Sequence, residues 1–487
     1  MMPKFVLLWT DAAMWLLLFA LIAYGVLVLR KPAWRASWRK VFSDAPALAS
    51  SVVLGLCLVL TMLDSVHFRS VLPAAQGAAA GSVAYDTRTR SLLDALLRGI
   101  VDSRETTYSR PLAYESLTKE TIDRAGKPER VAPRLLHGGM HLTDPAAQWA
   151  GDVTWRALAG LVFGAVAAAL LAAAVVAGVA RRSRSSWRLA AARVRYGETN
   201  IPWLAAITTV AVLCLLGGIA ISLGLRYHVF GTDVTGNDVL YQTLKSIRTA
   251  FVIGALATIA TLPLAVVLGI LAGYFKGWVD EAIQYLYTVL SSVPNILLIA
   301  ACVLMVQVFL DKHPEMFETG LERADLKLFL LCAVLGLTGW AGLCRLLRAE
   351  TLKLRELDYV QAAQAFGVGA GRIMRRHVFP NVAHLMLIVT VLEFSSLILY
   401  EAVLAYVGIG VDPSMNSFGG MINFARNEMS RDPVVWWPFA AAFSFMVAVV
   451  LAANLFADGV RDAFDPRSRA FRPRLSTRKP KTTASAA

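Results

Sequence analysis

Long apolar stretches dominate the pattern of hydrophobic and polar positions along this chain. About nine of them approach or exceed the roughly 18 residues that allow a helix to cross a bilayer. The predicted spans cover residues 5–29, 48–67, 153–180, 203–224, 249–275, 282–310, 326–347, 381–407 and 435–457. The alternating pattern of an outer-membrane barrel is absent. The sequence therefore predicts an all-α polytopic membrane protein.

Composition supports this fold class. Hydrophobic residues make up 57% of the chain and charged residues 17%, with a mean hydropathy of +0.56. The apolar run at 5–29 is long for a signal peptide, and no small-residue cleavage site follows it, so we read it as a span. The net charge of +14 could indicate nucleic acid binding, but basic residues in a membrane protein more often gather in cytoplasmic loops.

The basic residues predict an orientation. They cluster after the first span, after the third span, within residues 348–380 and in the tail from 461 to 481. The intervening loops lack this excess, and residues 311–325 are rich in acids. Because cytoplasmic loops carry the positive charge, an odd number of spans places the C-terminus in the cytoplasm and the N-terminus outside.

The chain divides into regions of different composition. Residues 1–202 form an N-terminal extension with three spans, an external segment at 68–152 and a basic stretch before residue 203. A six-span unit follows at 203–467, and residues 468–487 form a basic tail that we expect to be cytoplasmic. The external segment is long enough for a small folded cap, yet poor enough in apolar residues to be partly irregular.

A polar interruption at residues 348–380 is the most informative feature. Its centre carries a small apolar stripe at helical spacing, formed by Tyr359, Ala362, Ala363 and Phe366. A glycine-rich turn begins at Gly367 and leads into a basic segment containing Arg372, His377 and Pro380. A connecting loop needs such a helix only if something docks on it, so this segment indicates a docking site.

An external elbow is predicted at residues 230–240, before the fifth span. Gly231 and Gly236 permit tight turns, while Asp233 and Asp238 can cap helix starts. The functional interpretation is an ordered elbow that leads into the next helix. An ordinary loop with turn residues remains the alternative.

Two acids and two prolines interrupt the apolar spans. Glu393 and Glu401 lie two turns apart on nearly one face, and carboxylates at membrane depth usually face a polar cavity or a partner. They are candidates for lining a translocation pathway; a structural hydrogen bond, or for Glu401 proximity to the external interface, is the alternative. Pro263 and Pro294 each favour a kink.

Several catalytic and metal-binding motifs are absent. There is no G-x-x-x-x-G-K-[ST] phosphate loop, no H-E-x-x-H and no G-x-S-x-G, so neither ATP hydrolysis by that route nor a membrane-integral enzyme is expected. The five cysteines lie in or beside apolar runs without zinc spacing. His137 and His141 are separated by glycines, which argues against a rigid metal site. We expect no metal and no directly bound cofactor.

The segment 358–380 resembles the "EAA" loop of permease subunits in binding-protein-dependent ABC importers. Further segments, in the expected order, are similar to the dipeptide/oligopeptide/nickel subfamily: FGTDVTGNDVL at 230–240, LAGYFKGWVDE at 271–281, PNV at 380–382, EAVLAYVGIGV at 401–411, SFGGMI at 417–422 and DGVRDAFDPR at 458–467. The resemblance covers about 203–467 and not the extension.

The resemblance implies roles for individual residues. Ala362, Ala363 and Gly367 match the small residues of a coupling helix that seats in a groove on an ATPase subunit. Gln361 stands where glutamate is usual, which removes a charge and places an ion pair to the ATPase in doubt. Asn237 replaces the arginine usual in the elbow.

The resemblance further implies a non-catalytic inner-membrane subunit that works with several partners. These are a homologous permease subunit, two ATPase subunits that hold ATP and magnesium, and an external solute-binding protein, with no nucleic acid involved. The solute would be a peptide, a nickel complex or another small molecule. A proton-coupled secondary transporter using Glu393 and Glu401 is the alternative.

Overall fold

The computed structural model describes residues 4–71, 85–124 and 127–465. The basic tail at 468–487 therefore lies outside the described residues, as does the middle of the predicted external segment. The helices are α1 (Trp9–Arg30), α2 (Pro32–Val41), α3 (Ala45–Asp64), α4 (Leu92–Leu96), α5 (Arg98–Val101), α6 (Pro145–Ser183), α7 (Trp187–Arg195), α8 (Trp203–Gly224), α9 (Val239–Phe275), α10 (Gly277–Ser292), α11 (Asn295–Lys312), α12 (Gly320–Gly339), α13 (Ala341–Arg355), α14 (Asp358–Ala365), α15 (Ala370–Ile373), α16 (Phe379–Tyr406), α17 (Phe418–Glu428) and α18 (Trp437–Phe464).

The described residues contain eight helical segments long and apolar enough to cross a membrane. A ninth span arises if α12 and α13, which meet at a bend of 41°, count as one. The all-α membrane fold and the number of spans agree with the prediction. The turn η2 (Met374–Val378) joins α15 to α16 within one of these segments.

The two span prolines have different effects. Pro294 separates α10 from α11, so the sixth span is α11 alone and not the single span at 282–310, kinked at Pro294, that we predicted. The preceding Val293 is extended, as residues before proline prefer. Pro263 instead lies inside α9, which continues through it.

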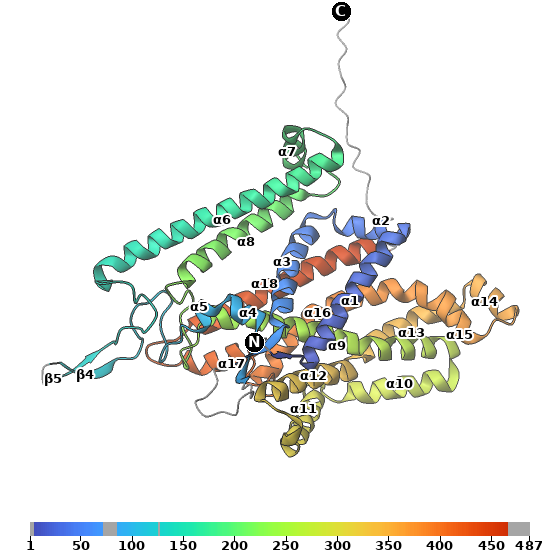
Figure 1. Cartoon of the computed structure of the whole chain (residues 1–487). Coiled ribbons are helices and arrows are strands. Elements are labelled where there is room, and N and C mark those ends of the chain that lie inside the picture. The colour runs from blue at the N-terminus through green and yellow to red at the C-terminus, as the bar shows by residue number, and fades with distance from the viewer. Residues whose placement is uncertain (1–3, 72–84, 125–126, 466–487) are drawn as a thin grey trace, which may run out of the picture.

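Helix α9 is the centre of the fold, and it packs against α12, α13, α16 and α3 (Figure 1). Glycines bring these helices close. A Cβ atom at Gly273 would lie 2.7 Å from the backbone oxygen of Arg348 on α13, and one at Gly336 of α12 would lie 2.3 Å from Ala260. Small residues at such contacts allow backbones to approach, which favours tight packing where no hydrophobic effect drives association.

The N-terminal extension surrounds part of this centre. Helix α3 packs against α18, α9 and α8, and α1 contacts α12 and α9. Helix α6 lies along α8 (Figure 1), where a G-x-x-x-G pattern, Gly160 to Gly164, meets Gly218. A Cβ atom at Gly164 would lie 2.4 Å from the carbonyl oxygen of Cys214, so only glycine fits there.

Two small antiparallel sheets lie outside the spans. The strands β1 (Lys4–Val6), β2 (His67–Val71) and β3 (Tyr85–Ser91) form one sheet in that order, and β4 (Glu120–Arg124) pairs with β5 (Lys127–Val131). The described part of the external segment is therefore a folded cap. Figure 1 shows β4 and β5 at the end of the molecule opposite to α14 and α15.

Candidate functional site

The 348–380 loop is anchored to the spans by apolar side chains. Val360, Ile373 and Val378 are fully buried, in one cluster with Leu343 and Leu347 of α13. Full burial of such a side chain contributes about 1.5–3 kcal/mol. The loop is consequently fixed to the helices behind it.

The predicted stripe points the other way. Tyr359 is 44% exposed and Phe366 is 87% exposed, Ala362 is exposed, and Ala363 is half-buried. An exposed phenylalanine on a firmly anchored helix provides an apolar contact surface at the tip of the molecule. Tyr359, Ala362 and Phe366 therefore lie on the outer side of this segment. Ala363 instead packs against the buried cluster behind it, so the structure does not keep the predicted stripe on one face.

Gly367 ends α14 in the left-handed region, with φ of +74°. Its N–H donates to the carbonyl of Gln364 at 2.9 Å, and the N–H of Val368 donates to the carbonyl of Ala363 at 3.1 Å. These bonds satisfy the last carbonyls of the helix, as a glycine C-terminal cap does. Among the described residues, no neighbour lies within 4 Å of a Cβ atom at this position, so the backbone conformation alone requires glycine.

The remaining loop residues lie around α14. Gln361 is exposed and its side-chain amide donates to the carbonyl of Glu356 at 3.3 Å. The ring of His377 lies 5.9 Å from that of Tyr359. Arg372 is exposed on α15, and Pro380 lies in the first turn of α16.

Polar contacts fix the base of the loop. Arg348 donates to Asp280 of α10 at 2.7 Å, and Arg355 donates to the carbonyl of Tyr274 of α9 at 2.9 Å. Gln364 of α14 donates to the hydroxyl of Tyr274 at 3.2 Å. The loop is therefore mechanically continuous with α9, the central helix.

The elbow at the other end is ordered by its two aspartates. Asp238 caps α9 by accepting the N–H of Tyr241 at 3.1 Å, as predicted. Asp233 does not cap a helix; it closes a turn by accepting the N–H groups of Thr235 and Asn237 at 2.8 and 2.9 Å. Asn237, the departure from the family pattern, is part of this turn.

The extension docks on the elbow. Gly231 and Gly236 have φ of +69° and +76°, and their missing side chains make room for it. A Cβ atom at Gly236 would lie 1.9 Å from the carbonyl oxygen of Glu105, and one at Gly231 would lie 2.3 Å from that of Ser109. The N–H of Ser109 donates to the Thr232 hydroxyl at 2.7 Å.

A buried charge cluster reinforces this contact. His228 contacts Asp238 at 2.7 Å and Glu105 of the extension at 3.3 Å. Burial by itself would lower the pKa of His228, but the hydrogen bonds to Asp238 and Glu105 raise it to about 9. The imidazole is therefore charged at neutral pH.

Glu105 also accepts hydrogen bonds from backbone groups within the extension. It accepts the backbone N–H groups of Leu136, His137 and Gly138 at 2.7–2.9 Å. Burial by itself would raise the pKa of Glu105, but the hydrogen bond from His228 and these backbone N–H groups lower it to about 2.

A second buried cluster was not predicted. Arg248 of α9 is 3% exposed and donates to Asp11 of α1 at 2.6 Å. It also lies 3.5 Å from Asp325 of α12, and Asp11 contacts His67 at 2.7 Å. The Thr10 hydroxyl donates to Asp325. The signal was present in the sequence, since Asp11 and Arg248 are ionisable residues within or beside apolar runs.

Lys245, one turn earlier on α9, also pairs with the extension. Its ammonium lies 3.3 Å from Asp64 and 2.9 Å from Asp94. Extension acids therefore neutralise both cations of this part of α9.

The acidic loop at 311–325 has a partner too. Arg69 of β2 donates to Glu322 at 2.8 Å and to Glu318 at 3.3 Å. Two acids of the 311–325 loop therefore bind the extension.

The two span acids lie in different environments. Glu401 is 3% exposed and accepts the N–H of Gly419 in the first turn of α17 at 3.3 Å. This position at the start of α17 favours the alternative that Glu401 makes a structural hydrogen bond, because a carboxylate stabilises a helix N-terminus. Glu393 is half-buried on α16.

His137 and His141, the two histidines considered for a metal site, have different partners in the structure. His141 contacts Asp152 at 2.8 Å, whereas His137 lies 3.9 Å from Glu105. Among the described residues no group of three or more His, Cys, Asp or Glu side chains could hold a metal ion. All five cysteines lie within the described ranges and are free.

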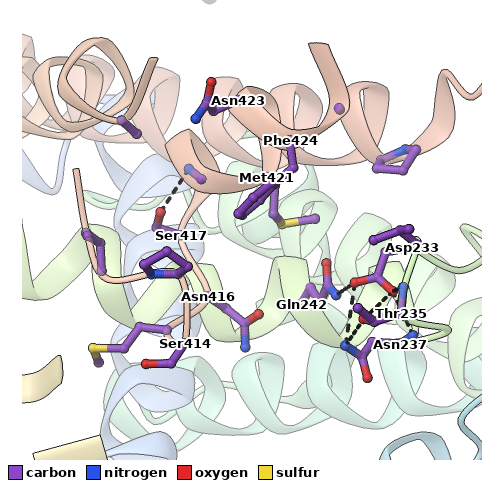
Figure 2. Close-up of a pocket in the computed structure, with 18 of the residues that line it drawn as sticks. Asp233, Thr235, Asn237, Gln242, Ser414, Asn416, Ser417, Met421, Asn423 and Phe424 are labelled. Atoms are coloured by element: carbon purple, nitrogen blue, oxygen red, sulfur yellow. Dashed lines mark hydrogen bonds between the residues drawn. The ribbon is translucent and has the colours of Figure 1, made fainter. Parts of the chain in front are cut away.

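A pocket of about 670 Å³, with both polar and apolar lining residues, opens beside the elbow. Figure 2 shows Asp233, Thr235, Asn237 and Gln242 gathered on one wall and Ser414, Asn416 and Ser417 on another. Met421, Asn423 and Phe424 of α17 lie over them. Arg104 and Tyr108 of the extension complete the lining.

Comparison with known proteins gives consistent matches. Residues 265–470 match the family model described as binding-protein-dependent transport system inner membrane component. The oligopeptide transport system permease protein OppC of Mycobacterium bovis is 32% identical over 245 residues, which cover 50% of this chain and 78% of that protein.

Two further similarities were found. The dipeptide transport system permease protein DppC of Lactococcus lactis is 29% identical over 243 residues, covering 50% of this chain and 64% of that protein. A solved structure of the MetNI methionine ABC transporter in inward-facing conformations has a TM-score of 0.34 and 16% identity, covering 47% of this chain and 96% of that chain.

Proposed function

Because this chain belongs to the family of binding-protein-dependent transport system inner membrane components, a family of non-catalytic multi-pass subunits, we propose that it is a permease subunit of an ATP-driven peptide importer. The names of its relatives, an oligopeptide and a dipeptide permease, support peptides or similar small solutes as cargo. The 348–380 loop would couple the ATPase to transport.

The arrangement of α14 carries the coupling proposal. Its inner side is anchored through Val360, while Phe366 and Tyr359 are exposed on its outer side. An element that transmits movement from an ATPase to the spans needs both a surface for the ATPase and a rigid attachment to the spans. The contacts of Arg355 and Gln364 with Tyr274 provide that attachment to α9.

The energy would come from other chains. The sequence has no phosphate loop, so ATP and magnesium would bind to two separate ATPase subunits. A homologous permease subunit would complete the pathway, and an external binding protein would deliver the solute. In this arrangement the loop and the C-terminus face the cytoplasm, and the N-terminus is external.

Transport would proceed by alternating access. ATP-driven closure of the ATPases would move α14, and the packed α13, α16 and α9 would convert this movement into opening on the external side. The hydrogen bond of Glu401 to α17 supports this mechanism over the proton-coupled alternative, because it gives that carboxylate a structural role.

The test is gentle purification of the tagged chain from its native membrane. We expect ATPase subunits to copurify, and Phe366→Ser to reduce their recovery because it removes the exposed apolar contact. Phe5→Ser is the matched control, since Phe5 is 70% exposed on β1, far from the loop. Failure to recover any ATPase with the unaltered chain would refute the proposal.

A further inference from the structure

The external pocket is built jointly by the extension and the six-span unit. The extension wall is firmly placed: Arg104 donates through Nε to the carbonyl of Thr235 at 2.8 Å, and Tyr108 is 4% exposed with its ring 6.5 Å from that of Trp437. A volume of about 670 Å³ falls in the range of small-molecule sites. The extension thus contributes fixed residues to a cavity of ligand size.

Helix α17 and the segment just before it, which contains Asn416, offer unused hydrogen-bonding groups. Within the part of the chain that the structure describes, the side-chain amides of Asn416, Asn423 and Asn427 have no hydrogen-bond partner. A primary amide donates and accepts at once, which complements the N–H and C=O groups of a peptide backbone. Phe424 and Met421 add apolar surface beside them.

The charged groups of the pocket differ in availability. Each lining acid already accepts hydrogen bonds from the protein: Asp233 from Gln242, Asp412 from Ser414 and Glu428 from Arg431.

Arg104, by contrast, is exposed and uses only Nε. Its two terminal nitrogens have no partner among the described residues. A guanidinium edge with free N–H groups binds a carboxylate in bidentate geometry. Lys327, the other cation of the lining, lies 3.9 Å from Asp412 and donates to Gln307 at 3.4 Å. The pocket therefore combines a guanidinium edge that has no partner among the described residues with several free amides.

We propose that this pocket binds a short peptide, with the free carboxylate of the peptide at Arg104 and its backbone amides along Asn416, Asn423 and Asn427. The proposal rests on the proposed import function and adds that the extension supplies part of the solute site at the external mouth.

Uptake by the whole importer in proteoliposomes, with its binding protein, tests the carboxylate contact. The probes are trialanine and trialanine amide, which lacks the terminal carboxylate. Arg104→Gln should raise the half-saturating concentration of trialanine about tenfold or more, because a hydrogen bond to a charged group is lost. Uptake of the amide should change less than about twofold.

Arg98→Gln is the control, since Arg98 is an exposed arginine of the same extension that pairs with Asp102 outside the pocket. Binding-protein-stimulated ATP hydrolysis and uptake of both probes should stay unchanged in Arg98→Gln. Equal effects of Arg104→Gln on the two probes, or no effect on either, would overturn the proposal.

A photolabelling experiment distinguishes failure of the pocket proposal from failure of the proposed import function. Asn423→Cys, modified with a benzophenone maleimide, should attach to radiolabelled trialanine on illumination, whereas the unaltered chain treated alike should not. Attachment to the binding protein alone, or uptake without any peptide attachment, would overturn the pocket. Peptide attachment without ATP-dependent uptake would support the pocket and refute the import function.

Discussion

Residue 367 illustrates how one backbone conformation can position the surface that we propose for ATPase contact. Gly367 has φ of +74° with open space around it, so a side chain there would cause strain and no clash. The strain would act directly on the end of α14, where Phe366 is exposed.

Gly367→Val should therefore disturb the proposed coupling surface and leave the spans intact. A left-handed conformation costs a non-glycine residue about 1–2 kcal/mol, and more when it is β-branched. We expect at least about a tenfold loss of ATP-dependent uptake, measured with radiolabelled peptide.

Gly369→Ala provides the comparison. Gly369 has φ of −59°, and no residue that the structure describes lies within 4 Å of a Cβ atom there, so alanine should be tolerated. If Gly367→Val retained normal uptake and normal ATPase copurification, α14 would not be the coupling element.

His228 should make the attachment of the extension depend on pH. Its pKa in the folded protein, about 9, lies above its ordinary value of 6.5. The charged imidazole therefore stabilises the contact with Glu105 fully below about pH 6.5, and this stabilisation is lost as the pH rises through about 9. Hydrogen exchange of residues 104–112 should accelerate on the order of tenfold or more between pH 7 and pH 10, beyond the intrinsic change.

His228→Gln should abolish this extra pH dependence, because the side-chain amide does not titrate in that range. His313→Gln is a suitable control, as His313 lies exposed at the end of α11, away from the elbow. An unchanged pH profile in His228→Gln would mean that another group controls the contact.

At the scale of elements, the extension is part of the permease fold and not an appended domain. Helix α9 carries Lys245 and Arg248, and the extension supplies Asp64, Asp94 and Asp11 to neutralise them. A buried charge without a partner is strongly unfavourable, so α9 depends on the extension for its stability.

Asp11→Ala should destabilise the protein by about 3 kcal/mol, because it removes the acid nearest to Arg248 and the acid that contacts His67. Arg248 keeps Asp325 at 3.5 Å, so its charge is not left wholly uncompensated. The midpoint of thermal unfolding in detergent should fall accordingly. Asp102→Ala, which breaks an exposed ion pair with Arg98, should change stability by no more than about 0.5 kcal/mol. Equal midpoints for the two variants would show that the Arg248 cluster is not a stabilising contact.

At the scale of the whole molecule, α14 and the pair β4 and β5 lie at opposite ends (Figure 1). The positive-inside rule assigns the α14 end to the cytoplasm. Cysteines placed at exposed sites report this orientation, because a charged maleimide does not cross the membrane.

Gln361→Cys, on the proposed cytoplasmic side, should react with a charged maleimide only after the membrane is permeabilised. Thr106→Cys, at an exposed position of the cap that we propose to be external, should react in intact cells. The unaltered chain gives the background, as Cys57, Cys332 and Cys344 are buried. Reversed labelling would invert the assigned orientation.

The sequence alone determined the membrane fold, the approximate spans and the existence of the two turn-rich segments. Apolar runs and glycine positions are local properties, and a bilayer permits few structures for them. The turn at Gly367 and the cap at Asp238 followed from residue type in the same way. The break at Pro294 was predicted only as a kink, because the length of α11 depends on packing.

Only the tertiary structure decided what the extension does. The pairing of Arg248 with Asp11 and that of Glu105 with His228 join residues more than a hundred positions apart. Charge neutralisation depends on which side chains meet in space, and single-sequence patterns do not encode that. For the same reason the pocket, with Arg104 from one region and Asn423 from another, became visible only once the chain was folded.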